Sequence, residues 1–306
     1  MGWATRMLKA ARVASDHAEL WLPAALATVS AVGWLPFVLA VVAFPGDGDL
    51  AFFASSIVLS PSFPLNVVPP IGALILLALS ASVLSATGEA VLLRTINRMS
   101  GIAPGARSID DEAARIWLIR LLAFLPALAV AIVLLAVVAG IAPGEYQSPE
   151  FGRGPLLIRL ARDVWPLLAL EAAVIVIGGA LAAGAVRASL GGEHVGVRRA
   201  VAAGFRELVR RPLRRIAIAA AIDLAFVAWL VATWALLRVL WTPIGRQAGE
   251  GALLTPGSVA LLVGFVAIWL CLVAGGGALH AWSSTWWSLE EAPETGRRGE
   301  DGDPWT

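Results

Sequence analysis

Six long apolar stretches constrain this chain more than any other feature of its sequence. None alternates apolar and polar residues as a membrane β-barrel strand does, so each span must satisfy its backbone polar groups as a helix. An α-helix needs roughly 20 apolar residues to cross a bilayer. The expected fold class is all-α, a polytopic integral membrane helical bundle of about six transmembrane helices. The expected spans are Trp21–Phe44, Val67–Leu93, Ile116–Ala142, Val164–Val186, Ile216–Leu240 and Val259–Trp282.

Composition excludes an ordinary water-soluble fold. The chain is 58% hydrophobic and only 15% charged, whereas soluble domains are about one-quarter charged. Its single cysteine, Cys271, lies in an apolar run and has no second cysteine to pair with. We therefore expect no disulfide, no metal and no other cofactor.

The basic residues between the spans predict an orientation. The N-terminal segment, the second and fourth connections and the tail together hold 17 Lys and Arg residues, against 5 on the opposite side. Because cytoplasmic connections carry the excess of Lys and Arg, the N-terminus is expected inside, and an even number of spans returns the C-terminus inside. The Arg- and Ala-rich composition is typical of a bacterial protein. We expect a multi-pass protein of the bacterial inner membrane with both termini cytoplasmic.

The chain divides into three parts on this interpretation. Residues 1–20 form a cytoplasmic amphipathic N-terminal segment, and residues 21–289 form the six-helix transmembrane domain. Residues 290–306 are acidic and polar, which predicts a disordered cytoplasmic tail.

The connection between the fourth and fifth spans has the strongest local pattern. At 196–211, apolar residues recur at three- and four-residue spacing, from Val197 through Val201 and Phe205 to Leu208, before Pro212 ends the helix. This pattern predicts a basic amphipathic helix on the inner leaflet, serving either as a lipid-sensing or partner-docking element or only to fix topology by its charge. The candidate contacts to anionic inner-leaflet lipids project from its opposite face: Arg198, Arg199, Arg206 and Arg210.

Ionisable residues inside the spans are costly and so are candidates for function. Glu89, Arg120, Asp223 and His280 fall in the inner halves of their spans, at similar depth if each residue rises about 1.5 Å. We hypothesise that Arg120 pairs with Glu89 or Asp223 and that His280 joins this polar cluster. It could form a proton or substrate path, or it could be a buried polar clamp or a set of side chains that snorkel to the interface. Glu171 lies nearer the outer surface, with no expected partner at its depth.

One resemblance covers most of the chain. The even spans end in small residues, a short basic helix occupies 196–211, and the last span ends in Gly275-Gly276-Gly277 and a run of aromatic and small residues up to Trp287. This layout resembles six-helix bacterial membrane proteins that are similar to the membrane domain fused to some glycerophosphoryl diester phosphodiesterases. The catalytic barrel and its motifs are absent from this sequence, so the resemblance implies a membrane protein without that activity.

Three functions are compatible with the sequence. The first is a non-enzymatic scaffold, assembly factor or lipid-environment component, whose partners are the bilayer, anionic inner-leaflet lipids and a membrane or cytoplasmic protein. The second is a permease subunit, because a cytoplasmic amphipathic helix before the last two spans resembles the layout of binding-protein-dependent permeases. The third is a lipid-acting enzyme, although the chain has no Walker A loop, HExxH or GxSxG motif. We expect the first, without enzymatic activity and without a nucleic-acid partner.

Overall fold

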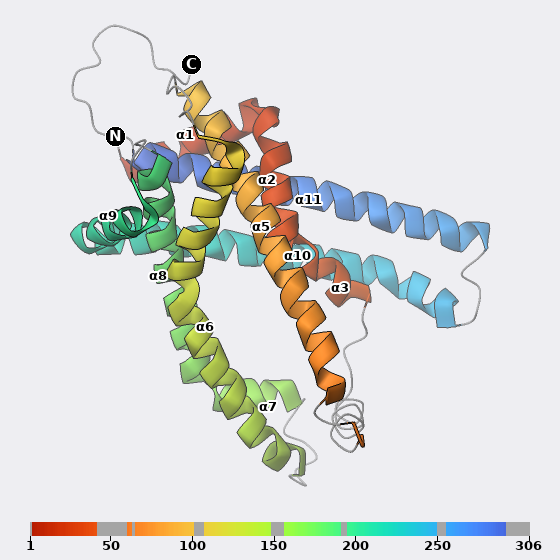
Figure 1. Ribbon diagram of the computed structural model, residues 1–306. Helices are drawn as coiled ribbons and strands as arrows, with labels where there is room; N and C mark the ends of the chain where they lie inside the picture. Colours follow the sequence, from red (N-terminus) through yellow and green to blue (C-terminus); the bar gives the residue numbers. More distant parts are fainter. Residues whose placement is uncertain are drawn as a thin grey trace, which may run out of the picture.

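The regular structure of this chain is helical wherever the structure describes it (Figure 1). The computed structural model describes residues 2–41, 60–62, 65–100, 107–147, 156–190, 195–249 and 255–291, and these contain no strand. The expected all-α fold class is therefore confirmed.

Five helices in the described residues are long and apolar enough to cross a membrane. Each covers one of the expected spans to within one residue and extends beyond it at one or both ends, because the flanking polar residues continue the helix. The start of α6 shows why, since the Ser108 hydroxyl accepts a hydrogen bond from the backbone N–H of Asp111 at 3.1 Å and caps the helix two turns before the apolar run. The five helices are α5 (Val68–Met99), α6 (Ile109–Gln147), α8 (Trp165–Leu190), α10 (Pro212–Gly249) and α11 (Pro256–Glu291).

The first expected span is bent. It consists of α2 (Trp21–Thr28), a π-helical turn (Val29–Gly33) and α3 (Leu35–Val41), with a 45° bend at the break. Pro36 explains the break, because a proline inside a helix has no N–H to donate to the carbonyl one turn earlier. The indole of Trp269 donates to the Gly33 carbonyl at 3.3 Å and so satisfies a backbone group at the bend. The described residues thus contain five candidate spans, or six if the bent pair counts as one.

The long helices pack in pairs that diverge from a shared end. α6 packs along α8, α10 packs against α11, and α2 lies between α5 and α11. In Figure 1 the α10 and α11 pair runs to the right, while α5, α6 and α8 run toward the bottom. Many side chains on these helices face outward, such as Leu76, Leu135 and Leu224, which are 67%, 69% and 70% exposed. Apolar surface of this extent suits contact with lipid.

Three short α-helices and two single 3₁₀ turns, Ala18–Leu20 and Leu65–Val67, complete the described structure. α1 (Trp3–Asp16) packs along α11, α7 (Leu156–Asp163) lies between α6 and α8, and α9 (Val197–Arg210) packs against α8. We call the end of the bundle that carries α1 and α9 the α9 end. Here α5, α8 and α11 finish, and α6 and α10 begin.

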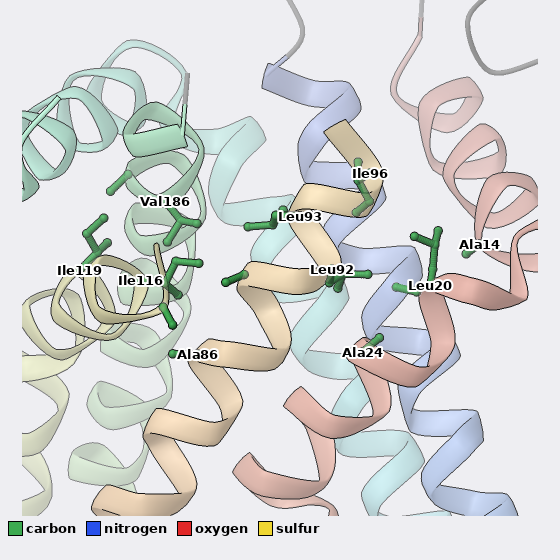
Figure 2. Packing of buried hydrophobic residues seen from close by; sticks show 14 of the residues in the cluster. Ala14, Leu20, Ala24, Ala86, Leu92, Leu93, Ile96, Ile116, Ile119 and Val186 are labelled. Carbon is green, nitrogen blue, oxygen red and sulfur yellow. The ribbon is translucent and has the colours of Figure 1, made fainter. Parts of the chain in front are cut away.

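The best-packed apolar core lies at the α9 end. Figure 2 shows Leu92, Leu93 and Ile96 of α5 between Ile116 and Ile119 of α6 on one side and the α2 segment on the other. Leu92, Ile96, Ile116 and Ile119 are fully buried. This end holds most of the helices together. A smaller buried cluster of Ala40, Leu237, Ile244 and Phe265 joins α3, α10 and α11 farther along.

Glycines allow α2 to approach both of its neighbours. A Cβ built on Gly88 of α5 would lie 2.7 Å from the Ala27 backbone nitrogen, and one on Gly277 of α11 would lie 2.8 Å from the Ala25 nitrogen. Real Cβ atoms do not come this close, so both positions require the absence of a side chain. Small residues at membrane helix contacts have this role in general.

The C-terminal boundary differs from the sequence expectation. α11 continues to Glu291, so the first two residues of the segment expected to be a tail, Glu290 and Glu291, belong to the helix. Their carboxylates pair with arginines of neighbouring helices, and this pairing stabilises the last turn. Residues 292–306, where a disordered tail was expected, lie outside the described residues.

Candidate functional site

Glu89 is the centre of a polar cluster inside the bundle. This residue of α5 is 4% exposed. Its Oε2 lies 2.5 Å from Nε2 of His280, and its Oε1 accepts a hydrogen bond from the Ser284 hydroxyl at 3.2 Å. His280 and Ser284 are one turn apart on α11, and this spacing places both on the same face of the helix. Two residues of α11 therefore hold one carboxylate of α5.

Arg120 adds a third helix to this cluster. Its Nη2 lies 3.5 Å from Oε2 of Glu89, and its Nη1 donates to the Ser85 hydroxyl at 3.4 Å. The structure thus places Arg120 beside Glu89 rather than beside Asp223. Three of the four residues proposed from the sequence, Glu89, Arg120 and His280, lie in contact.

Asp223 lies apart from these contacts but faces the same space. This residue of α10 makes no hydrogen bond or ion pair with any residue that the structure describes, and its Oδ2 is buried without a partner. One turn later, the ring of Phe226 packs edge-on against His280 at 6.0 Å between centroids. Phe226 therefore connects α10 to the cluster by ring packing, and the carboxyl of Asp223 stays unpartnered.

Sequence reasoning missed a fifth charged residue at this site, Arg187. It was assigned to a connection, but α8 continues to Leu190 and carries Arg187 inward. Its guanidinium donates to the Ser284 carbonyl at 2.7 Å, the Ala183 carbonyl at 3.1 Å and the Ser288 hydroxyl at 3.3 Å. No carboxylate of the described chain forms an ion pair with it. The signal that could have placed it is the lack of a helix-breaking residue before Gly191.

These side chains surround one cavity of about 380 Å³. This volume lies within the range of about 300–1,000 Å³ that is usual for small-molecule sites. Every candidate span contributes to its wall, including the π-helical turn of the bent one. The polar residues at the wall are Thr28, Ser85, Glu89, Arg120, Arg187, Asp223, His280, Ser283 and Ser284, and the larger apolar ones include Val32, Phe124, Ile222, Phe226 and Trp287.

The order of contacts in the cluster does not fit nucleophilic catalysis. A hydroxyl nucleophile needs a base beside it, usually an imidazole that is oriented by a carboxylate. Here the carboxylate of Glu89 stands between His280 and Ser284, so the imidazole does not touch that hydroxyl. The Ser283 hydroxyl donates instead to the His280 carbonyl at 2.9 Å. Among the described residues no group of His, Cys, Asp and Glu could hold a metal ion.

The face of α9 that packs on α8 is centred on Ala200, Gly204 and Leu208, which are buried. Val197 and Val201 are partly buried beside it, and Phe205 is 58% exposed. Gly204 determines which face packs, because a Cβ there would lie 2.8 Å from the Ala185 nitrogen of α8 and only a glycine permits that approach. The four arginines proposed as lipid contacts, Arg198, Arg199, Arg206 and Arg210, are all exposed.

Ion pairs join the helices at the α9 end. Glu290 of α11 accepts hydrogen bonds from Arg6 of α1 at 3.1 Å and from Arg214 of α10 at 2.8 Å. Glu291 accepts one from Arg215 at 2.5 Å. Arg6, Glu290 and Arg215 have nearly buried side chains, at 7%, 4% and 5% exposed. Buried pairs of this kind make the relative positions of α1, α10 and α11 specific.

No protein-family model, curated protein or solved structure matches this chain. The resemblance to the membrane domain of glycerophosphoryl diester phosphodiesterases therefore stays a prediction.

Proposed function

We propose that this chain is a non-enzymatic protein of the bacterial inner membrane, with both termini cytoplasmic, that binds a membrane lipid in its central cavity. It would act as a lipid-environment component, in line with the first of the functions expected from the sequence. The observation that carries the proposal is the cavity of about 380 Å³ lined by every candidate span and by charged side chains. A binding site at such a junction can couple the packing of all the helices to the presence of one ligand.

The surroundings of the cavity support a lipid as its occupant. The helices around it expose apolar side chains along most of their length, so a molecule that reaches the cavity from the side comes from the bilayer. The wall itself has an apolar part, with Val32, Phe124 and Phe226, beside the charged part. A lipid has the same two kinds of surface, an apolar chain and a polar headgroup.

Helix α9, which does not line the cavity, supports the same proposal. Its free surface carries Phe205 and Val209, which are 58% and 61% exposed, next to Arg206 and Arg210. Exposed apolar side chains beside arginines are typical of a helix at the level of anionic headgroups. The proposed orientation places this helix on the inner leaflet.

A permease subunit is the alternative, and the same surface of α9 is what favours it. In a permease this exposed face would contact a nucleotide-hydrolysing subunit rather than headgroups. The two functions predict different companions of the purified protein: bound lipid for the lipid-binding protein and an ATPase subunit for the permease.

Substitution of one glycine tests the proposed function. Gly179 lines the cavity, and a Cβ built there meets no atom within 4 Å, so Gly179→Leu would place a side chain in the cavity. Gly140 of α6 is equally free of neighbours but does not line the cavity, and Gly140→Leu is the matched control. The protein would be extracted into lipid nanodiscs, transferred to mild detergent and weighed by native mass spectrometry.

We expect wild type and Gly140→Leu to retain one phospholipid per chain and Gly179→Leu to retain none. Retention by all three proteins would contradict binding in the cavity. A wild-type protein that retains no lipid and co-purifies with a stoichiometric ATPase would favour the permease.

A further inference from the structure

The cavity wall carries both positively and negatively charged groups. These groups differ in how many hydrogen bonds and ion pairs they already make. Glu89 is fully engaged, because His280, Ser284 and Arg120 all lie against its carboxylate. It therefore forms a fixed part of the wall. The groups that remain for a ligand are the guanidiniums of Arg120 and Arg187 and the carboxyl of Asp223.

The two arginines offer donors to an oxyanion. Arg187 donates to two carbonyls and one hydroxyl, and a guanidinium has more N–H donors than these three contacts use. Its positive charge has no carboxylate in ion-pair contact among the described residues. Arg120 has only long contacts, at 3.4 and 3.5 Å, and its side chain is 30% exposed. A phosphate or carboxylate in the cavity would accept charge-assisted hydrogen bonds from these residues.

Asp223 offers the opposite charge. Its buried Oδ2 has no donor from the described part of the protein, and a buried polar atom without a partner is costly. An ammonium group is the ligand group that would satisfy it. A purely anionic ligand would leave this acid unpaired and would be repelled by it, and a purely cationic ligand would be repelled by the guanidiniums of Arg120 and Arg187 at the same wall.

We propose that the cavity binds a zwitterionic ligand whose phosphate or carboxylate lies at Arg120 and Arg187 and whose ammonium lies at Asp223. This inference rests on the proposed lipid-binding function and specifies its ligand class. The chemistry is shared by an aminophospholipid headgroup and by a free zwitterion such as an amino acid or a phosphorylated amino alcohol. The apolar part of the wall would hold the start of an acyl chain in the first case.

Competition between two lipids tests the headgroup. The protein would be reconstituted in nanodiscs that contain equal amounts of phosphatidylethanolamine, which carries an ammonium, and phosphatidylglycerol, which does not. Native mass spectrometry then counts which of the two remains bound. We expect the wild type to prefer phosphatidylethanolamine by about tenfold, which is the effect of one hydrogen bond to a charged group.

Two substitutions separate the role of Asp223 from a general effect on the bundle. Asp223→Asn removes the negative charge, and the tenfold preference is expected to disappear while lipid is still retained. Glu171→Gln is the matched control, because Glu171 also has a buried oxygen without a partner but does not line the cavity. It is expected to keep the preference. Size-exclusion profiles identify any variant that does not fold. Asp223→Glu keeps the negative charge and should therefore keep the preference.

The outcomes distinguish the inference from the function on which it rests. Retained lipid with equal amounts of both headgroups in the wild type, or an unchanged preference in Asp223→Asn, would overturn the zwitterion and leave lipid binding intact. A wild type that retains neither lipid would overturn the lipid-binding function. The zwitterion inference would then depend on soluble ligands: it is supported if free phosphoethanolamine at millimolar concentration raises the melting temperature while inorganic phosphate and ethanolamine do not, and it is overturned if phosphoethanolamine has no effect.

Discussion

Glu89 illustrates how a carboxylate is accommodated among apolar helices. An uncompensated charge in such a place costs several kcal/mol, and here three side chains from two other helices surround the carboxyl group. These contacts satisfy the charge only while α5, α6 and α11 keep their relative positions. The contacts of the polar cluster therefore depend on the packing of the bundle as well as on any ligand.

Replacement of His280 tests this dependence. His280→Ala removes the donor that lies 2.5 Å from Oε2 of Glu89 and leaves that oxygen with only the longer contact of 3.5 Å to Arg120. Loss of a hydrogen bond to a charged group is expected to lower the free energy of unfolding by about 2 kcal/mol. Denaturation in mixed micelles would measure the change.

His17 provides the control for this substitution. It lies 3.7 Å from Glu19 in a pair whose side chains are 38% and 63% exposed, so His17→Ala should change the free energy of unfolding by less than about 0.5 kcal/mol. Equal effects of the two substitutions would show that the contact with Glu89 contributes nothing specific.

Depth along a helix was predictable from the sequence, but direction around it was not. The rise per residue places Glu89, Arg120 and His280 at one level, and the structure brings these three together. The spans are apolar on all sides, so the pattern does not show which face turns inward, and the partner of Arg120 could equally have been Asp223. Arg187 was missed because the rule for connections assigned every arginine beyond the apolar run to the water.

At the scale of the elements, backbone contact through glycine determines where the helices lie. Gly88 and Gly277 approach α2 from opposite sides, and Gly204 brings α9 onto α8. The sequence predicted the helices and the amphipathic pattern of 196–211. It did not show which apolar residues of this helix pack on protein, because apolar spacing alone cannot tell a face that packs on protein from one that faces lipid: Leu208 is buried and Phe205 is exposed. The bend before Pro36 had a signal in the sequence, but its angle depends on packing against α11.

Two glycines of one helix allow a matched test of these contacts. Gly88→Leu forces a side chain into the backbone of α2, and overpacking of this kind is expected to cost about 3 kcal/mol. Gly72 lies on the same helix with nothing within 4 Å of a built Cβ, so Gly72→Leu should be tolerated. Melting temperatures in detergent would rank the two variants, and equal temperatures would argue against close packing at Gly88.

The position of α9 has its own test. Spin labels would be attached through Phe205→Cys or Arg199→Cys in a background in which the exposed Cys271 is replaced by serine. We expect the label at 205 to be accessible to oxygen in the bilayer and the label at 199 to a water-soluble nickel reagent. The reverse pattern, or two water-accessible labels, would mean that α9 lies away from the membrane surface.

At the scale of the whole molecule, one end is tightly packed and the other spreads open. The largest apolar cluster, the ion pairs of Glu290 and Glu291 and the contacts of α9 all lie at the α9 end, and a smaller apolar cluster joins α3, α10 and α11 farther along. The α10 and α11 pair then diverges from α6 and α8 (Figure 1). The apolar surface between the diverging pairs is available to lipid or to further protein.

Reporter fusions would test the proposed orientation of the whole molecule. With the α9 end in the cytoplasm, green fluorescent protein fused after Glu291 should fluoresce and alkaline phosphatase at the same place should be inactive. Fusion of the same two reporters after Gln147, at the far end of α6, should give the opposite result. An active phosphatase after Glu291 would reverse the assignment from basic residues.

The pairing of Arg6 with Glu290 also has a consequence for biosynthesis. The two residues are 284 positions apart in the chain, so a ribosome makes the arginine long before its partner. Until α11 leaves the translocon, Arg6 and Arg214 have no carboxylate from Glu290, and the α2 surface that Gly277 will cover stays open to lipid or to chaperones. Completion of the bundle therefore waits for α11, and a chain that stops before Glu290 would lack the carboxylate that joins α1 and α10 to α11.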